Sequence, residues 1–247
     1  MRRALELACP SVHSQTAPFL MLSESDYTAL WLTFRLAVTT TLLLLLLGTP
    51  LAWWLARTRS RWKSLLDATI ALPLVLPPTV LGFYLLVFLR PDGFVGRLID
   101  GLGGESLVFS FTGLVIGSMI YSLPFIVQPI QNAFASIEDH HLEVASSLGR
   151  SPRQRFFEVA LPLARPGILT GAVLGFAHTL GEFGVVLMIG GNIPGSTRVV
   201  SIAIYDHVES LDYDAAHRLS AILLVLSFLL LVAIYSSQKR RGLSTIR

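Results

Sequence analysis

The stretch SIEDHHLEVASSLGRSPRQRFFEVALPLARPGILTG occupies residues 136–171 and lies between two apolar runs. Leu142, Ala145 and Leu148 fall on one face at helical spacing, which predicts a first short helix. Gly149 comes next, where helices commonly end in the left-handed conformation that glycine adopts without strain. A second short helix is expected after it. The stretch therefore predicts two short helices joined at Gly149.

The ends of both helices carry sequence signals. Ser136 with Asp139, and Ser151 with Gln154, have the spacing of a capping box, in which a serine and a side chain three residues later satisfy the first free N–H groups of a helix. The Pro-Gly pair at 166–167 is expected to end the segment before the next apolar run. This connection is therefore expected to be structured along its whole length.

Composition places the chain in a membrane. Of its 247 residues, 53% are hydrophobic and 14% are charged, whereas a soluble domain has about 25% charged residues. Long apolar runs without alternation exclude a β-barrel, so the spans must be helices. Cys9 is the only cysteine, which excludes an intrachain disulfide and argues against a cysteine metal cluster. The sequence predicts an all-α integral membrane protein that binds neither metal nor nucleic acid.

Five apolar runs are expected to cross the bilayer, which takes about 20 residues of helix each. The expected spans lie at about 29–56, 65–89, 109–134, 168–189 and 219–235. They leave an amino-terminal tail at 1–28, the structured connection at 136–167 and a carboxyl-terminal tail at 236–247. Residues 1–20 lack an apolar core and precede a plausible start at Met21, so we expect them to be dispensable.

The basic residues indicate the orientation. With the amino terminus outside, the segments 57–64, 136–167 and 236–247 are cytoplasmic and hold four Lys plus Arg each, twelve in total. The segments on the other side, 1–28, 90–110 and 190–218, hold two each, six in total. Cytoplasmic loops carry the excess of basic residues in membrane proteins. We therefore expect five spans with the amino terminus outside.

The second expected span contains three prolines. Pro73, Pro77 and Pro78 lack an N–H, so the helix must kink or unwind. Such breaks are tolerated where protein or a water-filled cavity satisfies the freed carbonyl groups. Together with Thr79 and with Pro124 of the third span, they are candidates for lining a pathway through the membrane, with a packing kink as the alternative.

The fourth expected span carries ionisable residues. Glu182 lies near its middle, and charged residues inside spans are usually functional. Gly181 and Gly184 flank it and allow close helix approach. His178 is one turn earlier and is expected to share a face and pair with Glu182. These four residues are further pathway candidates, the alternative being a structural pair between helices.

The stretch at 136–171 also resembles the EAA signature of the membrane subunits of ABC importers. That pattern is Glu-Ala-Ala, a glycine four residues later, then a Leu-Pro and a Pro-Gly pair. The resemblance implies a type I ABC importer transmembrane fold, with this stretch as the coupling loop that docks into a groove of a cytoplasmic ATPase. An amphipathic loop that covers helix ends is the alternative. The matching residues are Glu143, Val144 (in place of the first alanine), Ala145, Gly149, Phe157, Leu161, Pro162, Pro166 and Gly167.

Three further segments resemble the molybdate permease branch of that family: LPLVLPPTVLGFYLLV at 72–87, LGEFG at 180–184 and NIPGSTR at 192–198. The sulfate permease branch shares similar segments, so the residues do not separate molybdate, tungstate and sulfate or thiosulfate. The resemblance implies a multi-pass protein of the cell (inner) membrane, assembled from two copies of this chain, two ATPases and an extracytoplasmic binding protein. The chain has no GxxxxGK[ST] phosphate loop, so ATP and Mg would be bound by the ATPase.

Two other classes of protein remain open. An integral membrane enzyme would use Glu182 and His178 as an acid–base pair, but the chain lacks HExxH, GxSxG and paired aspartates inside spans. A passive anion channel would not need a structured two-helix loop. No expected span carries a ladder of cations, which would trap an anion instead of releasing it.

Overall fold

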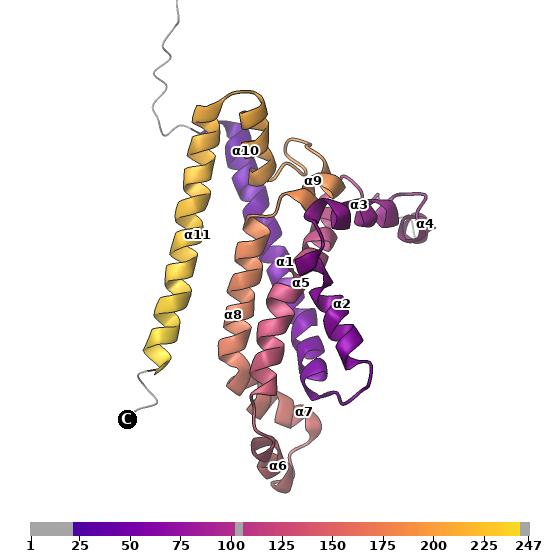
Figure 1. The fold of residues 1–247 in the computed structure, drawn as a ribbon, viewed down its shortest axis with the longest axis vertical. Helices are drawn as coiled ribbons and strands as arrows, with labels where there is room; N and C mark the ends of the chain where they lie inside the picture. Colours follow the sequence, from indigo (N-terminus) through magenta and orange to yellow (C-terminus); the bar gives the residue numbers. More distant parts are fainter. Residues whose placement is uncertain (1–21, 102–105, 243–247) are drawn as a thin grey trace, which may run out of the picture.

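The computed structural model describes residues 22–101 and 106–242, and all regular structure in these ranges is helical (Figure 1). The elements, in chain order, are α1 (Glu24–Arg57), α2 (Lys63–Val75), α3 (Pro78–Leu89), α4 (Phe94–Gly101), α5 (Phe111–Ala135), α6 (Asp139–Ser147), α7 (Pro152–Gln154), the π-helix η1 (Arg155–Ala160), α8 (Leu161–Leu180), α9 (Gly184–Gly190), α10 (Val200–Glu209) and α11 (Tyr213–Gly242).

Helices α1, α5 and α8 pack together at the centre of the molecule, and α11 stands at its edge against α10 and α8 (Figure 1). Near its start, α1 packs Ala29 against Val200 and Ala203 of α10. At its other end, Arg57 contacts Asp139 at the start of α6. The α6–α7 loop and α10 therefore lie at opposite ends of the bundle.

Glycines on one face of α8 let it approach α5 closely. Gly167, Gly171 and Gly175 recur every four residues, so they share a face. A Cβ at Gly171 would lie 2.8 Å from the Ile126 carbonyl oxygen, and one at Gly167 would lie 2.3 Å from the Ala133 Cβ. This is the small-residue packing typical of membrane helices.

The expectation that the Pro-Gly pair at 166–167 ends the segment is wrong. Helix α8 begins at Leu161 and continues through both residues to Leu180. A proline in a membrane helix is tolerated when neighbours satisfy the freed carbonyl group. Gly167 is used for close packing on α5, and nothing in the sequence of this segment alone distinguishes that use from a helix end.

The predicted break in the proline-rich run is confirmed between α2 and α3. Leu76 and Pro77 separate the two helices, whose axes are bent by 112°. Pro77 is the residue before α3 and Pro78 is its first residue, a position where the missing N–H costs nothing. Pro73 stays inside α2, so the break comes from the later pair.

A second break divides the run that was expected to be continuous from 168 to 189. Helix α8 ends at Leu180, Gly181 is its C-cap, and α9 starts at Gly184. The three residues 181–183 are thus outside both helices. The segment with Glu182 is a helix break, where the sequence analysis expected the middle of a helix.

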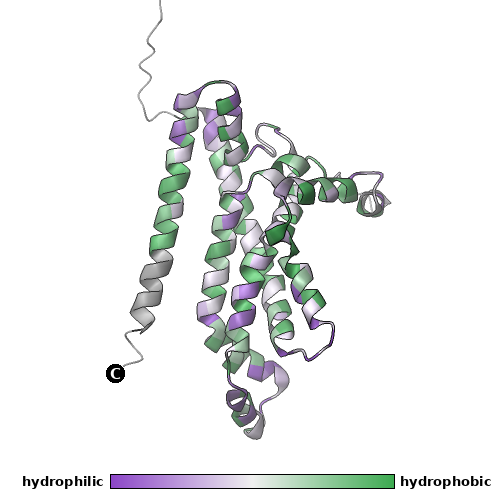
Figure 2. Ribbon diagram, in the orientation of Figure 1, coloured by the Kyte–Doolittle hydropathy of each residue, from purple (hydrophilic) through white to green (hydrophobic). Residues whose placement is uncertain are grey.

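Within the part of the chain that the structure describes, four helical stretches are long and apolar enough to cross a membrane: Glu24–Arg57, Phe111–Ala135, Pro152–Leu180 and Tyr213–Val232. The bent pair α2–α3 makes five if it is counted as one span. In Figure 2, apolar residues run along the lengths of these helices, while polar residues gather near α10 at one end and α6–α7 at the other. The number of spans and the outside location of the amino terminus stay predictions.

Replacing Gly171 by Ala tests the contact between α8 and α5. The new methyl group would lie 2.8 Å from the Ile126 carbonyl oxygen, and overpacking of this kind costs about 1–3 kcal/mol. We expect a lower midpoint of thermal unfolding in detergent. Gly101→Ala is the control, because a Cβ there meets no described atom within 4 Å. Equal midpoints for the two variants would contradict the packing argument.

Candidate functional site

The two-helix loop has the predicted geometry at its glycine. Gly149 has a φ of +76°, in the left-handed region that glycine favours. Its amide donates to the Ser146 carbonyl at 2.9 Å, and the Arg150 amide donates to the Ala145 carbonyl at 3.1 Å, which closes the end of α6. A Cβ at Gly149 meets no described atom within 4 Å. The constraint at this position is therefore one of backbone conformation and not of space.

Of the two predicted capping boxes, the second is confirmed and the first is wrong. The Ser151 Oγ accepts from the Gln154 amide at 3.3 Å, and the Gln154 Oε1 accepts from the Ser151 amide at 2.9 Å. At α6 the N-cap residue is Glu138, with no side-chain hydrogen bond. Ser136 instead ends α5, and its hydroxyl donates to the Ala133 carbonyl. Because α5 extends to Ala135, this serine closes one helix and does not open the next.

Residues on both sides of Gly149 contact the carboxyl-terminal end of α1. The Arg57 guanidinium donates to the Asp139 carboxylate and, at 3.1 Å, to the Ile137 carbonyl. On the other side of Gly149, Phe156 packs edge-on against Trp53 of α1, with 5.5 Å between ring centroids. These contacts join residues about 80 to 100 positions apart, so the local sequence does not predict them.

The residues of the EAA-like signature divide into an exposed and a packed set. Glu143 is exposed, and Val144 and Phe157 are apolar side chains exposed to 54% and 62%. Ala145 is buried at 7% exposure. The signature residues within 161–167 belong to the first two turns of α8. The exposed set thus presents one acidic and two apolar side chains at the end of the bundle.

A cavity of about 510 Å³ lies where the two helix breaks meet. A Cβ at Gly184, the first residue of α9, would lie 2.7 Å from the Pro78 Cβ at the start of α3. The breaks are thus in direct contact. The lining residues are Pro78, Thr79, Tyr121, Ala177, His178, Gly181, Glu182, Phe183 and Gly184.

The cavity contains six of the nine residues that the sequence analysis proposed for a pathway. Pro73, Pro77 and Pro124 are not among its lining residues. Tyr121 of α5 was missed, although a signal was available. Ser118, Tyr121, Ser122 and Phe125 follow the i, i+3, i+4, i+7 pattern of one helix face, which is a polar and aromatic stripe in an otherwise apolar span.

His178 is held by α5. Its Nδ1 lies 2.9 Å from the Ser122 Oγ, in a hydrogen bond whose direction depends on the tautomer. Its ring stacks on Phe125 with 3.9 Å between centroids and lies 4.6 Å from the ring of Tyr121. The expected pairing of His178 with Glu182 is wrong. The helix ends at Leu180, so the one-turn spacing no longer places the two side chains on one face.

Glu182 is buried without a counter-charge. Its side chain is 3% exposed, and among the described residues neither carboxyl oxygen has a hydrogen bond of normal geometry or an ion pair. The Ser118 hydroxyl of α5 interacts with the Glu182 carboxyl group, but neither group makes a hydrogen bond of normal geometry. The Glu182 backbone carbonyl, in contrast, accepts from the Ser201 hydroxyl of α10. The Glu182 backbone carbonyl thus has a hydrogen-bond partner, while the two buried oxygens of its carboxyl group have none of normal geometry.

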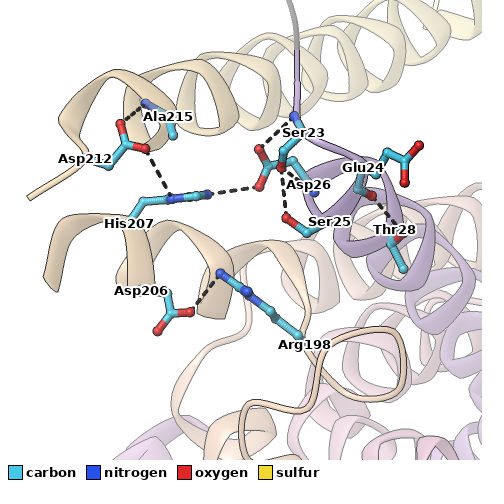
Figure 3. Close-up of polar contacts among 10 residues, drawn as sticks. All are labelled: Ser23, Glu24, Ser25, Asp26, Thr28, Arg198, Asp206, His207, Asp212 and Ala215. Carbon is cyan, nitrogen blue, oxygen red and sulfur yellow. Dashed lines mark hydrogen bonds and ion pairs between the residues drawn. The ribbon is translucent and has the colours of Figure 1, made fainter. Parts of the chain in front are cut away.

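A polar cluster joins α1, α10 and α11 at the end of the molecule opposite the loop (Figure 3). The His207 Nε2 lies 3.0 Å from an oxygen of Asp26, which is only 2% exposed, and the His207 Nδ1 lies 3.9 Å from Asp212. Arg198 forms an ion pair with Asp206 at 2.7 Å. This cluster fixes the starts of α1 and α11 on α10.

Possible metal ligands gather at one place among the described residues. Glu138, His140 and His141 place three ligand atoms within 4.8 Å of one another. All three residues are exposed on the surface at the start of α6. They lie away from the cavity, and the absence of a bound metal stays a prediction.

Comparison with known proteins assigns the chain to a family. Residues 48–241 match the family described as the binding-protein-dependent transport system inner membrane component. The chain belongs to this family. By that description it is an inner-membrane component of a transport system that depends on a binding protein. It is a transport subunit and not an enzyme, and the ATPase is a separate subunit.

Two relatives come from the molybdate and sulfate branches of the family. The molybdenum transport system permease of Azotobacter vinelandii is 59% identical over 90% of this chain and 99% of its own length. A probable sulfate transport permease of Zygnema circumcarinatum is 37% identical over 86% of this chain and 74% of its own length.

A solved structure confirms the fold. The chain superposes on a bacterial alginate ABC transporter, solved with a periplasmic protein that holds an alginate pentasaccharide, with a TM-score of 0.72. The sequence identity is 19%, and the match covers 90% of this chain and 81% of the other. The type I ABC importer fold that the sequence resemblance implied is therefore confirmed.

Asp26→Ala tests the polar cluster on α10. The change removes the acceptor for the His207 Nε2 and for the Ser23 amide in two part-buried hydrogen bonds, and the net contribution of such a bond is about 0.5–1.5 kcal/mol. We expect a lower midpoint of thermal unfolding for the purified protein. Glu24→Ala is the matched control, since Glu24 is an exposed acid in the same helical turn. A midpoint equal to that of the control would show that the cluster does not hold α1 in place.

Proposed function

We propose that this chain is the membrane-spanning permease subunit of an ATP-driven importer for molybdate, with tungstate as a second cargo of the same shape and charge. The observation that carries the proposal is the 59% identity over 99% of the length of the Azotobacter molybdenum permease. The sulfate permease relative is less similar and is matched over a smaller share of its length.

The cavity between the broken helices is proposed as part of the translocation pathway. Among the described residues, the lining contains two hydroxyl-bearing side chains (Thr79 and Tyr121), two glycines and the side chains of His178 and Glu182, and it contains no lysine or arginine. A pathway must bind an ion well enough to admit it and weakly enough to release it. A dianion would be held too tightly by a cluster of cations, so this lining suits a conduit that takes its cargo from a separate binding protein.

The two-helix loop is proposed as the coupling loop that docks on the ATPase. The exposed set of Glu143, Val144 and Phe157 would enter a groove of that partner. Closing of the two ATPases around ATP would draw two such loops together and turn the pathway outward. The outward state would receive the oxyanion from the extracytoplasmic binding protein, which is alternating access.

The working unit is proposed to be a homodimer. On α2 and α3, large apolar side chains remain exposed, among them Leu72 at 50%, Val75 at 82% and Tyr84 at 65%. These helices flank the break at Leu76–Pro77, whose freed backbone groups are costly to leave facing lipid. A second copy would cover this surface and complete the wall of the pathway.

Uptake measurements test the cargo. Cells that lack this chain are expected to lose high-affinity molybdate uptake and to regain it with the gene in trans. Because tungstate has the same tetrahedral dianionic form, excess tungstate should compete strongly, and sulfate should compete weakly. Strong competition by sulfate with little effect of tungstate would assign the chain to a sulfate importer instead.

Gly149 tests the coupling loop. A residue with a Cβ in the left-handed conformation is destabilised by about 1 kcal/mol, and by more if it is β-branched. Gly149→Val should therefore insert in the membrane but hold α6 at a wrong angle, which would lower uptake and weaken retention of the ATPase.

Gly149→Asn is the matched control, because asparagine tolerates the left-handed conformation. It should keep both uptake and ATPase retention at equal membrane abundance. If the valine variant keeps both as well, the loop is not the coupling element.

A further inference from the structure

We propose that Glu182 is a protonation-dependent gate of the cavity, which lets the oxyanion dianion pass only while its carboxyl group is neutral. This inference rests on the proposed function of the cavity as a pathway. It assigns to one side chain a role that neither the fold nor the cargo specifies.

The first support is the burial of the carboxyl group. Glu182 is 3% exposed and lines the cavity, yet neither of its oxygens has an ion pair or a hydrogen bond of normal geometry among the described residues. An ionised carboxylate in such a place is strongly unfavourable unless a cation compensates it, and the group takes up a proton instead. The geometry therefore favours the neutral form.

The second support is the absence of a compensating charge in the described surroundings. The titratable groups that face the cavity with Glu182 are Tyr121 from α5 and His178 from α8. His178 uses its Nδ1 on Ser122 and is covered by Phe125. From α3 the cavity receives Pro78 and Thr79, and neither titrates.

The charged groups on the other packed elements are engaged elsewhere. On α1, the Arg35 guanidinium lies over the Phe111 ring, 4.4 Å from its centroid. On α10, Ser201 bonds the Glu182 backbone carbonyl and Tyr205 bonds Glu209. Arg198, just before α10, pairs with Asp206. None of these contacts supplies a positive charge to the Glu182 carboxyl group.

The protonation state decides how the cavity treats an anion. A carboxylate would repel a dianion at short range, and inside a membrane protein this repulsion is screened far less than in water. A neutral carboxyl group carries no charge that would repel the dianion. One proton thus removes the barrier without creating a strong binding site, which is what a releasing pathway needs.

The sign of the pH dependence follows from this. Glu182 is neutral at low pH, and once the pH exceeds its titration range the neutral fraction falls about tenfold per pH unit. Oxyanion uptake by the wild type should therefore decline as pH rises. In Glu182→Gln the side chain stays neutral at every pH, so that decline should be absent.

The first test uses the complete transporter in proteoliposomes, with the same buffer on both sides and with molybdate as the cargo. The readout is the ratio of Glu182→Gln uptake to wild-type uptake at each pH, because the ATPase and the binding protein affect both in the same way. The ratio should rise severalfold from mildly acidic to alkaline pH. Glu182→Asp retains a titratable acid and should keep a falling profile. The control Glu24→Gln changes an exposed acid at the start of α1 and should give a flat ratio.

A flat or falling ratio for Glu182→Gln would overturn the gate. Loss of uptake by Glu182→Gln at every pH, with normal membrane abundance and ATPase retention, would also overturn it, because the negative charge would then be required.

A second test does not depend on the cargo or on the folding of the glutamine variant. The infrared spectrum of the purified wild-type transporter at neutral pH should contain the C=O band of a buried protonated carboxyl group, and this band should shift in Glu182→Asp. If wild-type proteoliposomes import neither molybdate nor tungstate, the proposed cargo is wrong, and the infrared band still decides the state of Glu182. If no Glu182-sensitive band is present at neutral pH, the gate is overturned whatever the cargo.

Discussion

A break in a membrane helix frees backbone groups that hydrocarbon cannot satisfy, and this constraint organises the structure. The breaks at 76–77 and 181–183 lie against each other, with Gly184 in contact with Pro78. Protein groups supply hydrogen bonds around them. The Ser201 hydroxyl of α10 bonds the Glu182 carbonyl, and the Phe109 amide bonds the Ile189 carbonyl at the end of α9. The cavity lies between the two breaks, and residues of α5 and α8 line the rest of it.

The position of this cavity depends on the contact between α5 and α8. Glycines on α8 let its backbone approach α5 closely, so that Gly171 lies against the Ile126 carbonyl and Gly175 lies against the Ile126 side chain. The contact sets where α8 ends relative to Ser122, which holds His178 by a hydrogen bond. Ser122 also bonds the Thr179 hydroxyl at 3.0 Å. One hydroxyl of α5 thus fixes two consecutive residues in the last turn of α8, next to the break.

Features that depend on local backbone chemistry could be predicted from the sequence, and those that depend on packing could not. The left-handed Gly149, the Ser151 capping box and the break at Pro77–Pro78 were all predicted, because each follows from residues within four positions. The Ser136 cap was wrong because α5 extends to Ala135. The pairing of His178 with Glu182 was wrong for a similar reason. It assumed that one helix continues through both residues, whereas α8 ends at Leu180.

The loop and the cavity are connected by one continuous helical element. Residues Pro152–Leu180 form 29 residues of unbroken helix, about 40 Å long at 1.5 Å per residue. Its loop end is held to α1 through Phe156, and its far end carries His178 at the cavity. On the other side of Gly149, Arg57 ties α6 to α1. If the loop couples to the ATPase as proposed, a displacement of it would reach the cavity wall through α8, because packed helices switch between discrete arrangements instead of bending gradually. A Cβ at Gly149 would meet no described atom within 4 Å, so under this proposal the backbone conformation of the glycine, and not a side-chain contact, sets the angle between α6 and the helix that continues into α8.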